Sequence, residues 1–269
     1  MVATTTQVTD LVRAVAGERV SVDGVLRPGG DPHGYEPRPS DVAAVAKAGL
    51  VFRSGGEVDD WLGGVIDNAG GGAEVVSLID SVDRIGDDPH WWLDPRNAER
   101  AVETIRARLA RLDPDGRAVY ARNAARLERR LRGLDSRIAA CVARVPQAKR
   151  KIVTTHDALG YFARRYGVEV VGAVIPSLST QAETSAGDVQ KLVDQIKRER
   201  VEAVFPESSV NPDIERAIAR EAGATVGDQL YADSLGPSGS PGATYVGAMA
   251  WDADALVRGM SGGRVPCRA

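Results

Sequence analysis

Cysteine, histidine and aromatic residues are scarce in this chain of 269 residues, which holds two cysteines, three histidines and 5% aromatics. No CxxC pair occurs, which excludes the metal-binding motifs built on that spacing. No apolar run approaches the ~18 residues of a transmembrane helix, and no HExxH pair marks a zinc protease. What remains is an ordinary globular composition, 43% hydrophobic and 26% charged.

The chain also has no large excess of charge of either sign, because 34 basic and 37 acidic residues leave a net charge of −3. Basic residues do gather locally at Arg126, Arg129, Arg130 and Arg132. No aromatic residues interleave with them as a nucleic-acid platform requires, so a charged helix face explains the run. Nucleic acid is therefore not expected as a partner.

The cysteines and the N-terminus leave two questions open. Cys141 and Cys267 could form a disulfide in an oxidising compartment, but the sequence does not show that they meet. Met1 leads into residues 2–6 without a basic start or an apolar segment, so no signal-peptide pattern is present. Either the protein is cytoplasmic, or a targeting segment has been removed ahead of Met1.

Strand-like and helix-like patterns alternate along the chain. Strands separated by helices of ten to fifteen residues favour βαβ units and parallel sheets, so the predicted fold class is α/β. The predicted strands are residues 19–25, 50–53, 74–78, 151–155, 169–175 and 202–205, and the predicted helices are residues 8–15, 40–48, 58–68, 158–166, 186–200 and 213–222.

One stretch, residues 94–145, interrupts this alternation with two consecutive helical patterns. The second, from about residue 115 to 145, repeats apolar residues at three- and four-residue steps and predicts a rod about 45 Å long. We interpret it as a rigid connecting helix (114–145) between an N-terminal α/β lobe (1–113) and a C-terminal one (146–269). A coiled-coil dimer arm is the alternative. Residues 70–72 and 236–242 are predicted loops.

All three histidines lie at junctions before predicted helices. His33 and His90 share the tripeptide Asp-Pro-His, and His156 follows the predicted strand 151–155. Loops at the carboxyl ends of strands in open α/β sheets converge on one crevice, so three imidazoles could meet there. Imidazole is the commonest nitrogen ligand of zinc and needs an acceptor on its other nitrogen. Acidic neighbours that could supply it are Asp31, Glu36, Asp94 and Asp157.

A tetrahedral metal site needs a fourth ligand. Glu207, Asp228 and Asp233 lie in loop-like settings of the C-terminal third, and their chemistry alone does not rank them. A single histidine at such a junction is more often a cap or a surface residue than a ligand. Spacing therefore predicts a metal site without completing it.

Several further motifs follow one another along nearly the whole chain, at residues 4–17, 31–37, 40–41, 50–52, 55–57, 61–62, 88–95, 156–162, 205–209, 233–236 and 244–245. Several gapped motifs in order are specific where one alone is weak. Together they resemble the metal-binding solute-binding proteins of ABC transporters, the family of ZnuA- and TroA-type zinc and manganese receptors.

The resemblance implies two α/β lobes joined by one long helix, with a metal cleft between the lobes. It implies the ligands His33, His90, His156 and Asp233, with Glu207 close to the site or as an alternate ligand. Three nitrogens and one carboxylate suit zinc, with manganese second. Residues 70–87 lack the His- and Asp-rich loop of some zinc-specific members.

The resemblance also implies a location and a partner. Family members work in the periplasm or on the outer face of the cytoplasmic membrane, some as lipoproteins, which favours a leader removed ahead of Met1. They deliver metal to a membrane permease, and a monomer is the default. The rival interpretations are a zinc hydrolase with Glu207 as its base, and a surface adhesin with a structural metal.

Overall fold

Parallel strands alternate with helices in both halves of the chain. The computed structural model describes residues 1–70 and 72–269, so Gly71 of the predicted 70–72 loop lies outside the described residues. The chain divides into two units, Met1–Gly133 and Leu134–Ala269. Each unit contains one four-stranded parallel sheet, which confirms the predicted fold class.

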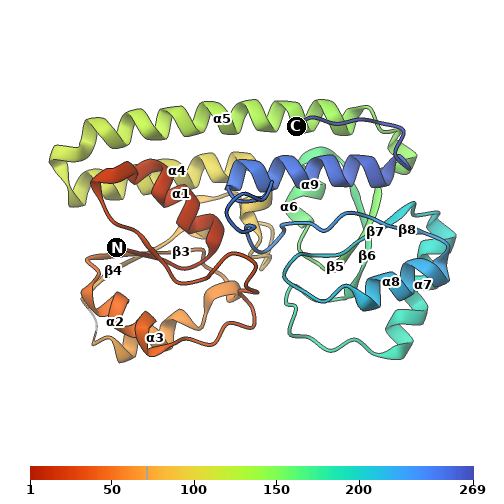
Figure 1. Cartoon of the computed structure of the whole chain (residues 1–269), viewed down its shortest axis with the longest axis horizontal. Coiled ribbons are helices and arrows are strands. Elements are labelled where there is room, and N and C mark those ends of the chain that lie inside the picture. Colours follow the sequence, from red (N-terminus) through yellow and green to blue (C-terminus); the bar gives the residue numbers. More distant parts are fainter. Residues whose placement is uncertain (71) are drawn as a thin grey trace. The chain divides into compact units, whose positions relative to one another are not determined.

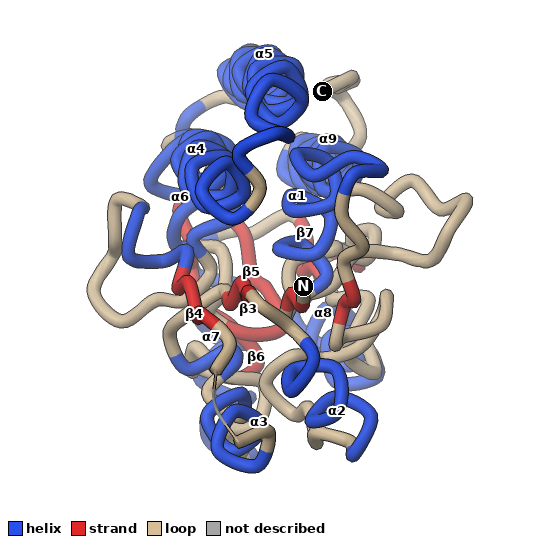
Figure 2. Tube along the Cα trace, turned by 90° about the vertical axis from the view of Figure 1, so that its left-hand side faces the viewer, coloured by secondary structure: helices blue, strands red, loops and turns tan. Residues whose placement is uncertain are grey.

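The sheet of the first unit has the strand order β2-β1-β3-β4. Its strands are β1 (Val2–Ala3), β2 (Asp23–Gly24), β3 (Leu50–Arg53) and β4 (Glu74–Ser77), and its helices are α1 (Thr6–Ala16), α2 (Pro39–Lys47), α3 (Leu62–Asn68) and α4 (Pro95–Leu112). Helices α2 and α3 cover one face of this sheet, and α1 and α4 cover the other (Figures 1 and 2).

Apolar periodicity and capping explain these elements. Valines of β1 and β3 pack against Val45 of α2 and against Leu62 and Val65 of α3, and all of these side chains are buried. Helix α4 begins where Asp94 accepts a hydrogen bond from Arg96 N, with Pro95 at its first position. Asp94 is therefore a helix cap.

The second unit repeats the plan with the strand order β6-β5-β7-β8. Helices α7 and α8 cover one face of the sheet and α9 packs on the other, against β5 and β7 (Figure 1). The strands are β5 (Lys151–His156), β6 (Glu169–Ile175), β7 (Ala203–Phe205) and β8 (Thr225–Val226), and the helices are α6 (Gly160–Tyr166), α7 (Ala186–Glu199), α8 (Asp213–Ala222) and α9 (Tyr245–Met260).

Helix α5 (Arg117–Ala143) begins in the first unit and ends in the second. Its 27 residues form the long connecting helix that the three- and four-residue apolar steps predict. Near its end, Asp135 accepts hydrogen bonds from Arg165 Nε at 2.9 Å and from the Tyr166 hydroxyl at 3.0 Å, both on α6. Among the described residues, no helix is both long and apolar enough to cross a bilayer.

A disulfide joins Cys141 near the end of α5 to Cys267 near the C-terminus. The bond answers the question that the sequence left open, and both cysteines lie in the second unit. The Cα atoms are 5.4 Å apart although 126 positions separate the residues in sequence. Arg144 Nη1 also donates to the Pro266 carbonyl at 2.9 Å, so the C-terminal segment is held beside α5 (Figure 1).

Reduction of this disulfide should lower the free energy of unfolding by about 3–5 kcal/mol, because it closes a long loop and restricts the unfolded chain. Urea unfolding with and without a thiol reductant measures the difference. The double variant Cys141→Ser/Cys267→Ser is the control, since its stability should not respond to reductant. Equal stability of the oxidised and reduced protein would contradict the expectation.

Candidate metal centre

Two Asp-Pro-His turns present histidines in the first unit. In each, the aspartate Oδ1 accepts a hydrogen bond from the backbone N–H of the histidine two residues later, at 2.9 Å for both Asp31–His33 and Asp88–His90. The short aspartate side chain thereby sets the direction in which the imidazole leaves the chain. The tripeptide Asp-Pro-His therefore forms the same turn at both positions.

The two imidazoles lie next to each other, with Nε2 of His33 and Nε2 of His90 3.4 Å apart. His90 is fully buried, and its Nδ1 lies 2.7 Å from Asp88 Oδ1, which engages that nitrogen and leaves Nε2 as the ligand atom. Two ligands about 2.05 Å from one zinc ion at a tetrahedral angle stand about 3.3 Å apart. The spacing in the first unit fits that geometry.

The second unit holds His156 at the end of β5, with two carboxylates against its two ring nitrogens. Nδ1 lies 2.7 Å from Glu207 Oε1, and Nε2 lies 3.2 Å from Asp233 Oδ2. All three side chains are buried, and Glu207 follows the neighbouring strand β7. The separation of Nε2 from Asp233 again fits two ligands of one tetrahedral ion.

The electrostatics of this group favour a cation. Burial opposes charging of the His156 imidazole, but the charges of Glu207 and Asp233 outweigh burial and raise its pKa well above the usual range. In the metal-free protein a proton on His156 therefore offsets part of the negative charge. A divalent cation would take over that role, so metal and proton compete for this group.

Buried hydrogen bonds fix the position of Glu207. Its backbone N–H donates to Thr155 Oγ1 at 3.1 Å, and the Thr155 hydroxyl donates to Glu215 Oε1 on α8 at 2.6 Å. Burial raises the pKa of Glu215, against the effect of the Thr155 hydrogen bond. The carboxylate beside His156 is thus anchored to β5 and, through Thr155, to α8.

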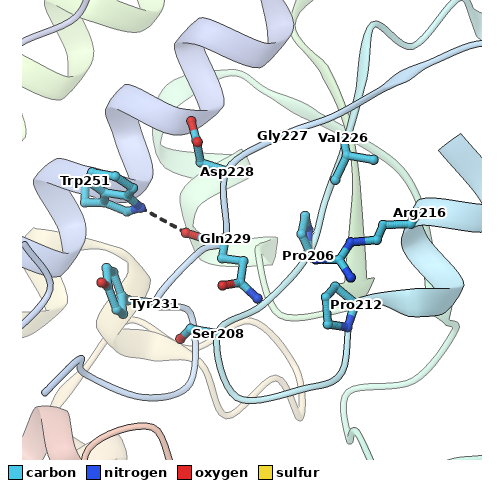
Figure 3. A pocket seen from close by; sticks show the side chains of 10 residues that line it. All are labelled: Pro206, Ser208, Pro212, Arg216, Val226, Gly227, Asp228, Gln229, Tyr231 and Trp251. Carbon is cyan, nitrogen blue, oxygen red and sulfur yellow. Dashed lines mark hydrogen bonds between the residues drawn. The ribbon is translucent and has the colours of Figure 1, made fainter. Parts of the chain in front are cut away.

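The loop that carries Asp233 is fastened by α9. Trp251 Nε1 donates to the Gln229 carbonyl at 2.9 Å, and Asp252 Oδ1 accepts from Tyr231 N at 2.8 Å. Figure 3 shows Trp251 beside this loop, with its hydrogen bond to Gln229. Both residues line a hollow of about 380 Å³. Leu230 N and O bond the segment Pro206–Ser208, so the loops of Glu207 and Asp233 are tied together.

The candidates for the fourth ligand have different surroundings. Asp233 lies against His156, whereas Asp228 is about half exposed and forms an ion pair with Arg258 at 3.1 Å. Two aspartates that support the site, Asp88 and Asp252, lie outside the set predicted from the sequence. Asp88 was detectable, because it repeats the position of Asp31 in the same tripeptide. Asp252 was not, because it lies in a helix whose contact with the Asp233 loop depends on the fold.

Asp252 should make stability fall as pH rises. Burial raises its pKa to about 8, whereas in the unfolded chain it titrates near 4. Between these values the folded state holds a proton that the unfolded state has lost, so stability is full below about pH 4 and declines toward pH 8. Asp252→Asn should remove this decline, which amounts to about 4 kcal/mol between pH 5 and pH 8. Urea unfolding at pH 5 and pH 8 measures it, and parallel pH profiles for the two proteins would contradict it.

Two parallel sheets flanked by helices, a long connecting helix, two adjacent imidazoles in one unit and a buried imidazole between two carboxylates in the other are features of the metal-binding, substrate-binding receptors of ABC transporters. The chain belongs to the ZnuA family, described as the zinc-uptake complex component A, periplasmic, whose profile matches residues 1–259. The resemblance that the motifs predicted is confirmed.

Relatives within this class have names that mention different metals. The chain is 34% identical over 258 residues to the manganese-binding lipoprotein MntA of Halalkalibacterium halodurans, covering 94% of this chain and 85% of that protein. It is 27% identical over 276 residues to the iron ABC transporter substrate-binding lipoprotein MtsA of Streptococcus pyogenes serotype M1, covering 97% and 88%. The periplasmic zinc binding protein TroA of Treponema pallidum superposes with a TM-score of 0.91 at 28% identity, covering 97% of this chain and 98% of that one.

Proposed function

We propose that this protein captures zinc outside the cytoplasmic membrane and delivers it to the permease of an ABC transporter, with manganese as the second candidate. Membership of the family supports the transport role. Relatives named as lipoproteins support an extracytoplasmic location, in the periplasm or at the outer face of the membrane. A monomer is the proposed oligomeric state. The metal is the cargo of such a receptor, and no chemical step follows its binding.

We further propose that His33, His90, His156 and Asp233 bind one metal ion together. The observation that carries this proposal is the ligand spacing within each unit, 3.4 Å between the imidazoles of the first and 3.2 Å between His156 and Asp233 of the second. Each pair supplies half of a tetrahedral set. Glu207 stays beside the set and orients His156.

Donor chemistry supports zinc as the first choice. Three imidazole nitrogens and one carboxylate oxygen suit zinc, whereas manganese favours oxygen-rich sites. The zinc-binding name of the structurally similar TroA agrees with this choice. The manganese-binding name of a relative 34% identical to this chain keeps manganese as the specific alternative.

Titration of the metal-stripped protein with zinc and manganese tests the ligand set. We expect one ion per chain and tighter binding of zinc. His156→Ala and Asp233→Ala should each weaken binding more than about 100-fold, because losing a ligand costs more than the 10–100-fold typical of a supporting residue. Asp228→Ala is the matched control, since Asp228 pairs with Arg258 at the surface. Unchanged affinity in either ligand variant, or turnover of an ester or peptide, would contradict the proposal.

Zinc affinity should fall as the pH decreases, because protons compete for the imidazoles. Glu207 raises the pKa of His156, so competition begins at a pH above the usual imidazole range. Glu207→Gln removes that charge and should move the loss of affinity to lower pH. Calorimetric titrations between pH 5 and 8 measure the shift. A variant with the wild-type pH profile would show that Glu207 does not act on His156 in this way.

Release of the metal, we propose, follows displacement of the Asp233 loop when the receptor docks to the permease. Between β8 and α9 this loop has no regular secondary structure and depends on the hydrogen bonds of Trp251 and Asp252. Breaking those contacts would remove one ligand without unfolding a strand. Crystal structures with and without metal test the idea, and a loop immobile in both would count against it.

A further inference from the structure

An arginine-lined hollow lies beside the disulfide of the second unit. Three guanidinium side chains, those of Arg137, Arg144 and Arg268, line this space of about 420 Å³ together with Ala140, Cys141 and Pro266. All three arginines are exposed. None of them forms an ion pair within the part of the chain that the structure describes. Their charge is therefore available to an external anion.

The same face of α5 carries further arginines ahead of the hollow. Arg122, Arg126 and Arg130 precede Arg137 at steps of four, four and seven residues, which places them on one side of a helix. Each is exposed and, over the described residues, without an ion pair. We call Arg122, Arg126, Arg130 and Arg137 the arginine face of α5.

The acidic residues of α5 do not neutralise the arginine face. Glu128 pairs with Arg132 at 3.9 Å, and buried Asp135 accepts from Arg165 of α6. Helix α5 has seven arginines and two acids, while the whole chain has a net charge of −3. Positive charge is thus concentrated on one helix of an acidic protein, which favours binding in one orientation.

We propose that the arginine face and the hollow bind the phosphate headgroups of an anionic phospholipid membrane. Guanidinium groups bind phosphate through two parallel hydrogen bonds. The apolar side chains of Ala140 and Pro266, which also line the hollow, suit the acyl chains next to a lipid headgroup. No aromatic side chain lines the hollow for stacking bases or anchoring a protein, which disfavours both of those partners. The membrane as partner rests on the proposed extracytoplasmic function.

Cosedimentation of the full-length, zinc-loaded protein with vesicles tests this surface. We expect binding to phosphatidylglycerol vesicles at low salt, little binding to phosphatidylcholine vesicles, and loss of binding as salt rises. The triple variant Arg137→Gln/Arg144→Gln/Arg268→Gln should lower the partition coefficient on the order of 100-fold, at about fivefold per arginine.

The matched control is Arg100→Gln/Arg117→Gln/Arg220→Gln, which removes the same charge at exposed arginines that belong neither to the arginine face nor to the hollow and should keep vesicle binding. Circular dichroism and zinc titration of both triples separate failure of this inference from misfolding or from failure of the metal site. Equal loss in both triples, equal binding to neutral vesicles, or equally tight binding of single-stranded DNA through the same arginines would each overturn the assignment to phospholipid.

Discussion

The buried pair of His156 and Glu207 is the interaction on which the site in the second unit depends. A carboxylate 2.7 Å from Nδ1 selects the ring orientation and leaves Nε2 toward Asp233. Burying the Glu207 carboxylate is unfavourable without partners, and His156 supplies two to Glu207 Oε1, its ring Nδ1 at 2.7 Å and its backbone N–H at 3.4 Å. The Thr155 hydroxyl accepts from the backbone N–H of Glu207 and holds that residue in place. Adjacent parallel strands make this possible, because β5 and β7 end at the same edge of the sheet.

The two units hold their histidines by different means. In the first unit the supporting carboxylate is local, since Asp88 lies two residues before His90 and contacts both its ring and its backbone. In the second unit it is 51 residues away, just after the end of another strand, β7. A local turn holds its geometry largely by itself, whereas a long-range pair is only as well placed as the strands that carry it. The hydrogen bonds from Thr155 and α9 are therefore the supports that this second arrangement needs.

Particular elements show how far periodicity predicts this fold. The strand Glu169–Ile175 and the long helix Arg117–Ala143 follow closely from the sequence, because the strand is a short apolar run and the apolar residues of the helix recur at three- and four-residue steps. Strand β1 has only two residues, Val2–Ala3, yet lies inside its sheet between β2 and β3. Helix α9 was not predicted, because small and apolar residues occur on most sides of the helix and no single apolar face is distinct in its sequence. The conformation of such elements is fixed by packing against neighbouring strands and helices and not by a pattern in their own sequence.

The sequence by itself determined the α/β class, the connecting helix, the two Asp-Pro-His turns and the residue types suited to zinc, because these depend on spacing within a few turns of chain. Only the tertiary structure decided that Cys141 meets Cys267 and that Asp252 fastens the loop of Asp233. It also placed Asp233 against His156, a carboxylate that the family resemblance implied but that spacing alone did not rank above Asp228. Each of these joins residues far apart in sequence, and chain spacing carries no record of which distant surfaces pack together.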